Sequence, residues 1–272
     1  MFLHVYILLF ADLNVDMVEG ASRLAGDSET WNSNDIGIMC SFAAVMSLYL
    51  KKTFKKNIYL ANLLFLIPIA FMTGSRKTFI ILILSVALFY VFSAKRGKLL
   101  NTMLAIITIV FSYYLVMSVP SLYDSVGIRI ESMLNVFTGV STIDSSTRLR
   151  MNMIEYGLIW FKEKPLLGVG IDNYRYLWHS VSGVAMYAHN NYIEILVDLG
   201  IVGFIVYYSI YISAIRKLTK SLKYDRYFFA VALSILLTLA TVEMSLVSYN
   251  YRFIQIILCL VLCITRIPIK KH

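Results

Sequence analysis

The residue of this sequence best suited to acid–base chemistry is a histidine at the end of a long polar stretch. His189 closes that stretch and is followed almost at once by an apolar run that begins at Tyr192. An imidazole with an ordinary pKa of about 6.5 accepts a proton readily at neutral pH. We therefore predict that His189 is a general base at a membrane boundary. The alternative is a capping or surface histidine, which is the commoner role, and His179 in the same stretch carries no further signal.

The neighbours of His189 have side chains that can support this role. Asn190 and Tyr192 are predicted to orient the base or the acceptor of the reaction. Glu194 and Asp198 lie four residues apart, so one face of a helix carries both carboxylates. Two carboxylates on one helix do not straddle a sugar, which argues against a glycosidase pair. We expect instead that Glu194 pairs with a nearby arginine or holds His189.

Arginines form the second group of candidate site residues. A planar guanidinium binds the oxygens of an anionic ligand such as a phosphate in bidentate fashion. Arg76 lies in a tight connection at a membrane edge, and Arg148 precedes an amphipathic stretch. These two are the first candidates for phosphate binding, and snorkelling to lipid headgroups is the alternative for Arg76. The further candidates are Arg23, Arg150 and Arg252.

Composition indicates that these residues are held by a membrane protein. Of the 272 residues, 59% are hydrophobic and 15% are charged, and the mean hydropathy is +0.72. Ordinary globular domains carry roughly 25% charged residues. We expect an all-α, polytopic protein with about seven transmembrane helices, since a helix needs about 20 apolar residues to cross a bilayer and shorter runs borrow from their flanks. The predicted spans are 36–50, 58–73, 78–93, 99–119, 192–215, 227–247 and 253–264.

The distribution of basic residues predicts the orientation of the chain. Clusters of lysine and arginine occur at every second connection, in 51–56, 95–98, 216–226 and 266–271. Cytoplasmic connections are enriched in these residues, so the remaining connections are expected outside the cell. The predicted domains are N-terminal transmembrane helices in 1–119, an extracytoplasmic catalytic loop in 120–191, and C-terminal transmembrane helices with a cytoplasmic tail in 192–272. The net charge is +9, and the basic residues lie in short clusters between apolar runs. This distribution favours the lipid surface over nucleic acid as the partner.

The large loop carries its own helical signal. An amphipathic helix is predicted over 149–163, and Lys164-Pro165 should end it. The G-x-G sequence at Gly168 and Gly170 lacks the third glycine of a dinucleotide site, so we expect it to permit tight backbone geometry beside the membrane. No cluster of cysteine and histidine predicts a metal site. Glu243 lies inside the apolar run 227–247, where an ionisable group is a candidate functional residue. The alternative, which we prefer, is an ion pair with Arg252 or Arg76.

Taken in order, these motifs resemble the C-terminal core of the O-antigen ligase and O-antigen polymerase family. The resemblance rests on Arg148, the sequence KPLLGVG in 164–170, the sequence HNNYIE in 189–194, and Gly200. Arg76, in the sequence GSR before an apolar helix, matches that family's other recurrent arginine, and Asn32 and Asn34 are similar to its asparagine pair. Family members usually have more spans, and 1–11 is too short to cross a bilayer. We therefore expect an N-terminally truncated member, with a short interfacial helix as the alternative for 1–11.

This resemblance implies a metal-independent, inverting glycosyltransferase that uses no cofactor. It would take a glycan from a polyprenyl diphosphate at the outer face of the bacterial cytoplasmic membrane, in O-antigen, capsule or exopolysaccharide synthesis, with other assembly proteins as further partners. We prefer a polymerase, because a ligase needs a lipid A-core acceptor that nothing in the sequence identifies. The alternatives are that ligase and a non-enzymatic transporter of lipid-linked glycan. A transporter would use the arginines but would not need His189.

Overall fold

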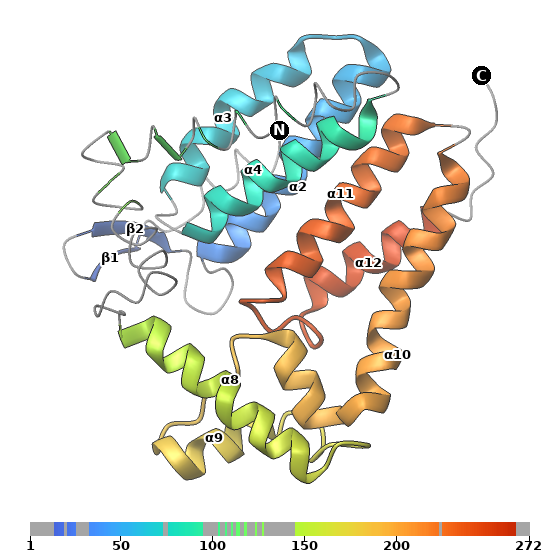
Figure 1. Ribbon diagram of the computed structural model, residues 1–272. Coiled ribbons are helices and arrows are strands. Elements are labelled where there is room, and N and C mark those ends of the chain that lie inside the picture. Colours follow the sequence, from blue (N-terminus) through green and yellow to red (C-terminus); the bar gives the residue numbers. More distant parts are fainter. Residues whose placement is uncertain are drawn as a thin grey trace. The chain divides into compact units, whose positions relative to one another are not determined.

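The computed structural model describes a chain made almost entirely of helices. It describes residues 14–18, 21–25, 33–72, 76–94, 145–222 and 225–264, with isolated positions between 103 and 127. Figure 1 shows the elements in chain order, coloured from blue to red. They are β1 (Asn14–Val18), β2 (Ala21–Ala25), α2 (Ser33–Phe54), α3 (Ile58–Met72), α4 (Arg76–Ser93), α8 (Ser145–Glu163), α9 (Tyr174–Ser182), α10 (Asn191–Ser221), α11 (Arg226–Val242) and α12 (Arg252–Ile264).

The expected helical fold is confirmed for the described residues, with one addition. β1 and β2 form a short antiparallel hairpin, in which Asn14 pairs with Ala25, and the sequence had not predicted it. Within the described residues, two helices are long and apolar enough to cross a bilayer, Asp35–Phe54 and Asn191–Lys220. Shorter apolar helices cover Ile80–Ser93, Arg226–Val242 and Arg252–Leu262. The arrangement with seven spans and an outer loop stays a prediction.

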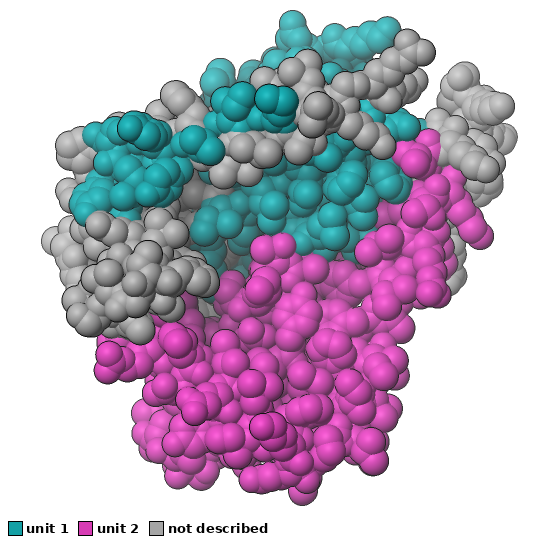
Figure 2. Space-filling view, in the orientation of Figure 1, with its two compact units in different colours: residues 1–134, 225–238 teal, residues 135–224, 239–272 magenta. Residues whose placement is uncertain are grey.

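The chain divides into two compact units, which Figure 2 colours separately. Unit 1 comprises 1–134 and 225–238, and unit 2 comprises 135–224 and 239–272. In unit 1, α2 packs against both α3 and α4. A Cβ added to Gly37 would lie 2.0 Å from Thr78 Oγ1, so a small residue allows α2 and α4 to approach closely. Close contact through small residues is the usual way in which helices associate in a membrane.

Unit 2 is built around α10, with α8 and α9 packed on its N-terminal part. α8 extends one turn further toward the N-terminus than the predicted 149–163 and ends before Lys164-Pro165, as expected. α9 was not predicted, and it ends at Gly183, whose φ of 76° and N–H bond to the His179 carbonyl terminate the helix. A buried cluster joins these helices, formed by Met153, Trp160, Tyr174, Trp178, Ala188 and Val197.

α10 covers the apolar run predicted over 192–215, and it is interrupted at Gly200. Gly200 has φ 66° and ψ −169°, a conformation that is essentially restricted to glycine. In an unbroken helix, the N–H groups of residues 201 and 202 would bond to the carbonyls of residues 197 and 198. The break leaves these four backbone groups without their helical partners, and buried backbone groups must be paired elsewhere.

The loop between α8 and α9 pairs with all four of these groups. Ile201 N–H and Val202 N–H donate to carbonyls of the loop, and carbonyls of Val197 and Asp198 accept from amides of the loop. The four bonds are Ile201 N to Pro165 O at 2.9 Å, Val202 N to Leu166 O at 3.3 Å, Val169 N to Val197 O at 2.9 Å, and Gly170 N to Asp198 O at 2.8 Å. We call this pairing of 165–170 with 197–202 the glycine clasp.

Two glycines make the glycine clasp possible because the two backbones nearly touch. A Cβ added to Gly168 would lie 2.4 Å from the Asp198 carbonyl carbon, and one added to Gly200 would lie 2.3 Å from the Leu166 oxygen. Gly168 also has a positive φ of 69°. The sequence prediction that the G-x-G loop serves tight backbone geometry therefore agrees with the structure, although its partner is the broken helix.

The region after α10 also differs from its prediction. The predicted span 227–247 is helical only from Arg226 to Val242, and a turn follows in which Met244 N–H donates to the Thr241 carbonyl and Ser245 N–H donates to the Val242 carbonyl. Glu243 therefore lies just beyond the helix instead of inside it. Tight turns of this kind satisfy the last carbonyls of a helix. The apolar pattern of the sequence continues through the turn, so it did not reveal where the helix ends.

We predict that Gly200→Ala destabilises the protein by more than about 2 kcal/mol, because it adds a forbidden backbone conformation to a steric clash. Gly183→Ala is the matched control. Gly183 also has a positive φ, of 76°, but no atom lies within 4 Å of its added Cβ, so only about 1 kcal/mol is expected. Thermal unfolding of the two variants in detergent measures the difference. Equal unfolding temperatures would contradict the proposed clash with the loop.

Candidate functional site

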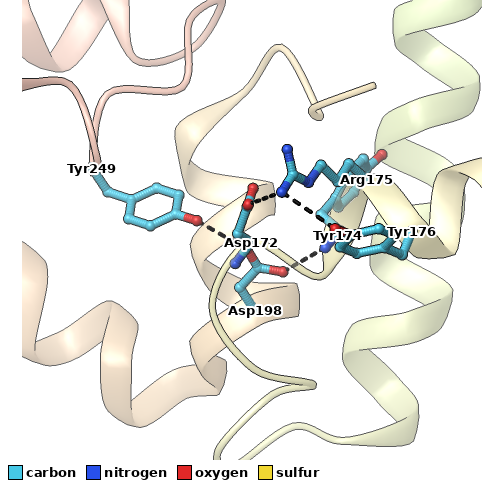
Figure 3. A network of polar contacts seen from close by, with 6 residues as sticks. All are labelled: Asp172, Tyr174, Arg175, Tyr176, Asp198 and Tyr249. Atoms are coloured by element: carbon cyan, nitrogen blue, oxygen red, sulfur yellow. Dashed lines mark hydrogen bonds and ion pairs between the residues drawn. The ribbon is translucent and has the colours of Figure 1, made fainter. Parts of the chain in front are cut away.

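The carboxylate of Asp198 fixes the start of α9 to the broken helix. Asp198 is completely buried. Its Oδ1 accepts from Tyr174 N–H at 2.8 Å, and its Oδ2 accepts from Asp172 N–H at 2.9 Å and from the Tyr249 hydroxyl at 3.1 Å. Figure 3 shows Asp198 between the start of α9 and Tyr249. A carboxylate is favoured at a helix N-terminus because the first N–H groups have no helical partner.

The surface of this region carries a second, weaker contact between charged groups. Arg175 forms an ion pair with Asp172, and its guanidinium lies 5.0 Å from the centre of the Tyr176 ring. Both members of the ion pair have nearly half of their side chain exposed. An exposed ion pair contributes little to stability, so the burial of Asp198 is the dominant constraint.

Tyr174 connects α9 to α8. It is completely buried, its hydroxyl donates to the Met153 carbonyl at 2.7 Å, and Trp160 packs edge-on against its ring. Burial raises the pKa of the Tyr174 hydroxyl, and the nearby carboxylates of Glu194 and Asp198 raise it further. The hydroxyl therefore stays protonated and remains a donor. α8, α9 and the start of α10 consequently form one packed support.

His189 lies at the edge of this support in an unusual backbone conformation. Its φ is 52°, which is uncommon for a residue other than glycine. The ring of Tyr187 lies 4.2 Å from the imidazole, measured between ring centroids. His189 is partly buried. Strained backbone of this kind persists where the surrounding structure holds it, and it is often found at functional sites.

The residues on either side of His189 supply that support. The buried Glu194 carboxylate accepts from Ala188 N–H at 2.6 Å. Asn190 caps α10 by accepting from Ile193 N–H at 3.1 Å, and its amide donates to the Met244 carbonyl at 3.3 Å. Glu194 thus contacts the backbone beside His189, whereas in the described residues no ion pair joins it to an arginine.

Asn191 and Tyr192 attach the same segment to the end of α11 and to the connection that follows. Asn191 is completely buried, and its side-chain oxygen accepts from the N–H groups of Ser248 and Tyr249, both at 2.9 Å. The Tyr192 hydroxyl donates to the Ala240 carbonyl at 2.8 Å, and its ring stacks on Tyr208. Tyr192 therefore positions the helix start, and its ring is only partly exposed.

Glu243 lies in a cage of hydroxyl groups that the sequence analysis did not anticipate. Its carboxylate accepts from the hydroxyls of four residues, and its carbonyl accepts from Asn191 N–H at 2.8 Å. The four donors are Tyr207 at 2.8 Å, Tyr208 at 3.0 Å, Tyr211 at 2.7 Å and Ser248 at 2.5 Å. The expected ion pair with Arg252 is absent from the described contacts. The spacing of the three tyrosines on α10 was the available signal, because residues three and four apart share a helix face.

The candidate arginines differ in what the structure describes. Arg148 is in the first turn of α8 and Arg252 begins α12, and both side chains are exposed. Arg76 begins α4, Arg23 lies in β2 and Asn34 lies in α2, but the side chains of these three residues and all of Asn32 lie outside the described part. Arg76 and His189 belong to different units, so their sharing of one site stays a prediction.

Chemically, the described side chains at this site can move protons and form hydrogen bonds. Among the residues that the structure describes, no three histidine, cysteine, aspartate or glutamate side chains are grouped as metal ligands. The buried carboxylates are occupied by backbone amides and hydroxyls, which suits positioning. Of the candidate residues that the structure describes, His189 is partly buried and the side chain of Arg148 is exposed.

Comparison with known proteins identifies a family. A family model described as O-antigen ligase matches residues 60–208, which is more than half of the chain. The matched region begins in α3 and ends in α10, and therefore includes Arg76, Arg148, the glycine clasp and His189. The comparison with curated proteins finds no match.

We predict that Asp198→Asn destabilises the protein by about 2 kcal/mol. The change keeps the size of the side chain but replaces one acceptor oxygen with an NH₂ group that faces a donor, which leaves a buried polar group unpaired. Asp172→Asn, which removes the exposed ion pair, should cost less than about 1 kcal/mol. The unfolding temperature in detergent and the rate of proteolysis within α9 report the two effects. An unchanged unfolding temperature and an unchanged rate of proteolysis in the Asp198→Asn variant would exclude this carboxylate as the anchor of α9.

Proposed function

The chain belongs to the O-antigen ligase family, and from that premise we propose that it is a glycosyltransferase which polymerises lipid-linked glycan units. Membership implies a membrane protein that processes glycans in O-antigen synthesis, by ligation or polymerisation. The proposed donor is a glycan on polyprenyl diphosphate, at the outer face of the cytoplasmic membrane. The acceptor would be a second glycan on the same carrier.

In the proposed reaction, a hydroxyl of the acceptor sugar attacks the anomeric carbon of the donor. The bond from that carbon to the diphosphate oxygen breaks, polyprenyl diphosphate leaves, and the configuration at the carbon inverts. His189 accepts the hydroxyl proton as general base. Arginine groups, with Arg76 and Arg148 first and Arg23 and Arg252 as further candidates, neutralise the leaving diphosphate.

The observation that carries this proposal is the way in which His189 is held. Its backbone has a positive φ, and the residues before and after it are bonded to Glu194 and Met244 respectively. A general base must lie within hydrogen-bond distance of the proton that it removes, so a fixed backbone favours catalysis. A transporter that only binds lipid-linked glycan has no need for a held imidazole.

The exposed guanidinium of Arg148 gives further support. It lies in the first turn of α8, and α8 is packed against α9 through Trp160 and Tyr174. Asp198 in turn binds the start of α9 to α10, the helix that follows His189. Arg148 and His189 therefore belong to the same unit. Asn32 and Asn34 are proposed to contact the substrate. Asn190, Tyr192 and Glu194 are proposed to contact it as well, and in the described structure they hold the backbone around His189.

We predict that His189→Ala lowers the transfer rate by about 10²-fold or more while donor binding is retained, because proton removal typically contributes that much. Arg76→Ala and Arg148→Ala should weaken donor binding as well as the rate. The measurement is glycan chain length in cells that lack the endogenous gene and express each variant at a matched level. Single lipid-linked units in place of long polymer are expected for all three variants.

Two controls match these substitutions. His179→Ala removes an exposed histidine of α9, and Arg216→Ala removes an exposed arginine near the other end of α10, so both should leave long polymer. Normal polymer with His189→Ala would exclude the general base. If cells that express the unaltered protein make no polymer but transfer preassembled glycan to a lipid A-core acceptor, the protein is a ligase instead.

A further inference from the structure

The surroundings of α10 change abruptly at Gly200. In 191–199, before the break, every residue is buried or partly buried within the chain. After the break, one face of the helix is exposed and apolar. Its exposed apolar residues are Ile201, Val202, Ile205, Val206 and Ile212, with exposed fractions between 36% and 63%, and the exposed polar residues beside them are Ser209 and Ser213. An exposed apolar face on a helix of this length and hydropathy is a surface for lipid.

The apolar part of α10 beyond the break is short for a membrane span. It runs over 201–215, about 22 Å at 1.5 Å per residue, whereas the hydrocarbon core is about 30 Å thick. Arg216 and Lys217 follow directly, and such side chains extend toward the headgroups at a membrane surface. Further apolar surface at the opposite end, beside Gly200, would therefore complete the span.

The glycine clasp places such a surface there. Leu166 is 66% exposed and Leu167 is 73% exposed, and Ile171 beyond the clasp is 68% exposed. The two leucines are adjacent in the loop, so together they form a continuous exposed apolar surface. The bonds from Val202 N–H to the Leu166 carbonyl and from Ile201 N–H to the Pro165 carbonyl hold the two leucines beside the first lipid-facing residues of α10.

The charged residues next to this loop match a membrane surface. Lys162, Glu163 and Lys164 are all exposed and directly precede Pro165. Their net charge is positive, and lysines with apolar neighbours are typical of segments that lie at the boundary between headgroups and acyl chains. The two leucines therefore continue the lipid-facing surface of α10, with basic groups at its rim.

We propose that Leu166, Leu167 and Ile171 insert into the bilayer leaflet on the His189 side and form a shallow membrane anchor. The occupant of this surface is the acyl-chain region of lipid, argued from its continuity with the lipid-facing side of α10. Through the glycine clasp, the anchor sets the depth of α8, α9 and His189 relative to the membrane. The proposal concerns lipid contact alone and does not depend on the glycosyl-transfer chemistry.

Site-directed spin labelling tests this anchor. In the full chain with Cys40, Cys259 and Cys263 replaced by alanine, a nitroxide is attached at Leu167→Cys, and the protein is placed in phosphatidylethanolamine and phosphatidylglycerol vesicles. Collisions with oxygen, which concentrates in lipid, are compared with collisions with a water-soluble nickel chelate. The control is Ser180→Cys, on the exposed side of α9.

We expect the label at position 167 to collide with oxygen several-fold more, relative to nickel, than the label at position 180. Equal access to nickel at the two positions would overturn the anchor. Protection from both reagents would overturn it as well, because the surface would then be covered by protein. Dipolar broadening between labels at position 167 would assign the surface to contact between two copies of the chain, which also contradicts the proposal.

Discussion

The pairing of backbone groups across the break in α10 is the constraint on which the rest of unit 2 depends. A helix that stops hydrogen bonding leaves amides and carbonyls without their helical partners, and each such group that is buried and unpaired is costly. The glycine clasp pairs four such groups with one loop. Because the partners are backbone atoms on both sides, the loop cannot move without breaking α10 further, so the helices on either side of the loop are fixed as well.

Buried side chains extend this constraint to His189. Asp198 lies inside the glycine clasp and binds the start of α9, while Glu194, one turn earlier, binds the amide of Ala188. Asn191 and the Glu243 cage attach the same segment to the connection between α11 and α12. The carboxylates of the region thus act as acceptors for the protein itself, and Glu194 fixes the backbone directly before His189.

The sequence predicted those parts of the molecule that depend on composition and local pattern. Apolar runs located the helices, and the amphipathic stretch with Lys164-Pro165 gave α8 to within one turn. The break at Gly200 was missed because the apolar pattern continues through it, and the ending of α11 at Val242 was missed for the same reason. The donors that Glu194 and Glu243 have in the described structure, one amide and four hydroxyls, were not predicted, because an acid that is buried by folding takes whichever donors the tertiary contacts bring.

The central claim is that the loop between α8 and α9, which has no regular secondary structure, is held by backbone hydrogen bonds as firmly as a helix is. Amide hydrogen exchange within this loop tests that claim most directly. In lipid nanodiscs, the amides of Val169 and Gly170 should exchange as slowly as those in the middle of α8. The connection 183–187, most of which is exposed, should exchange rapidly and serves as the reference for an ordinary loop. Exchange of Val169 and Gly170 at the rate of 183–187 would show that the glycine clasp does not hold the loop, and would contradict the account of how His189 is positioned.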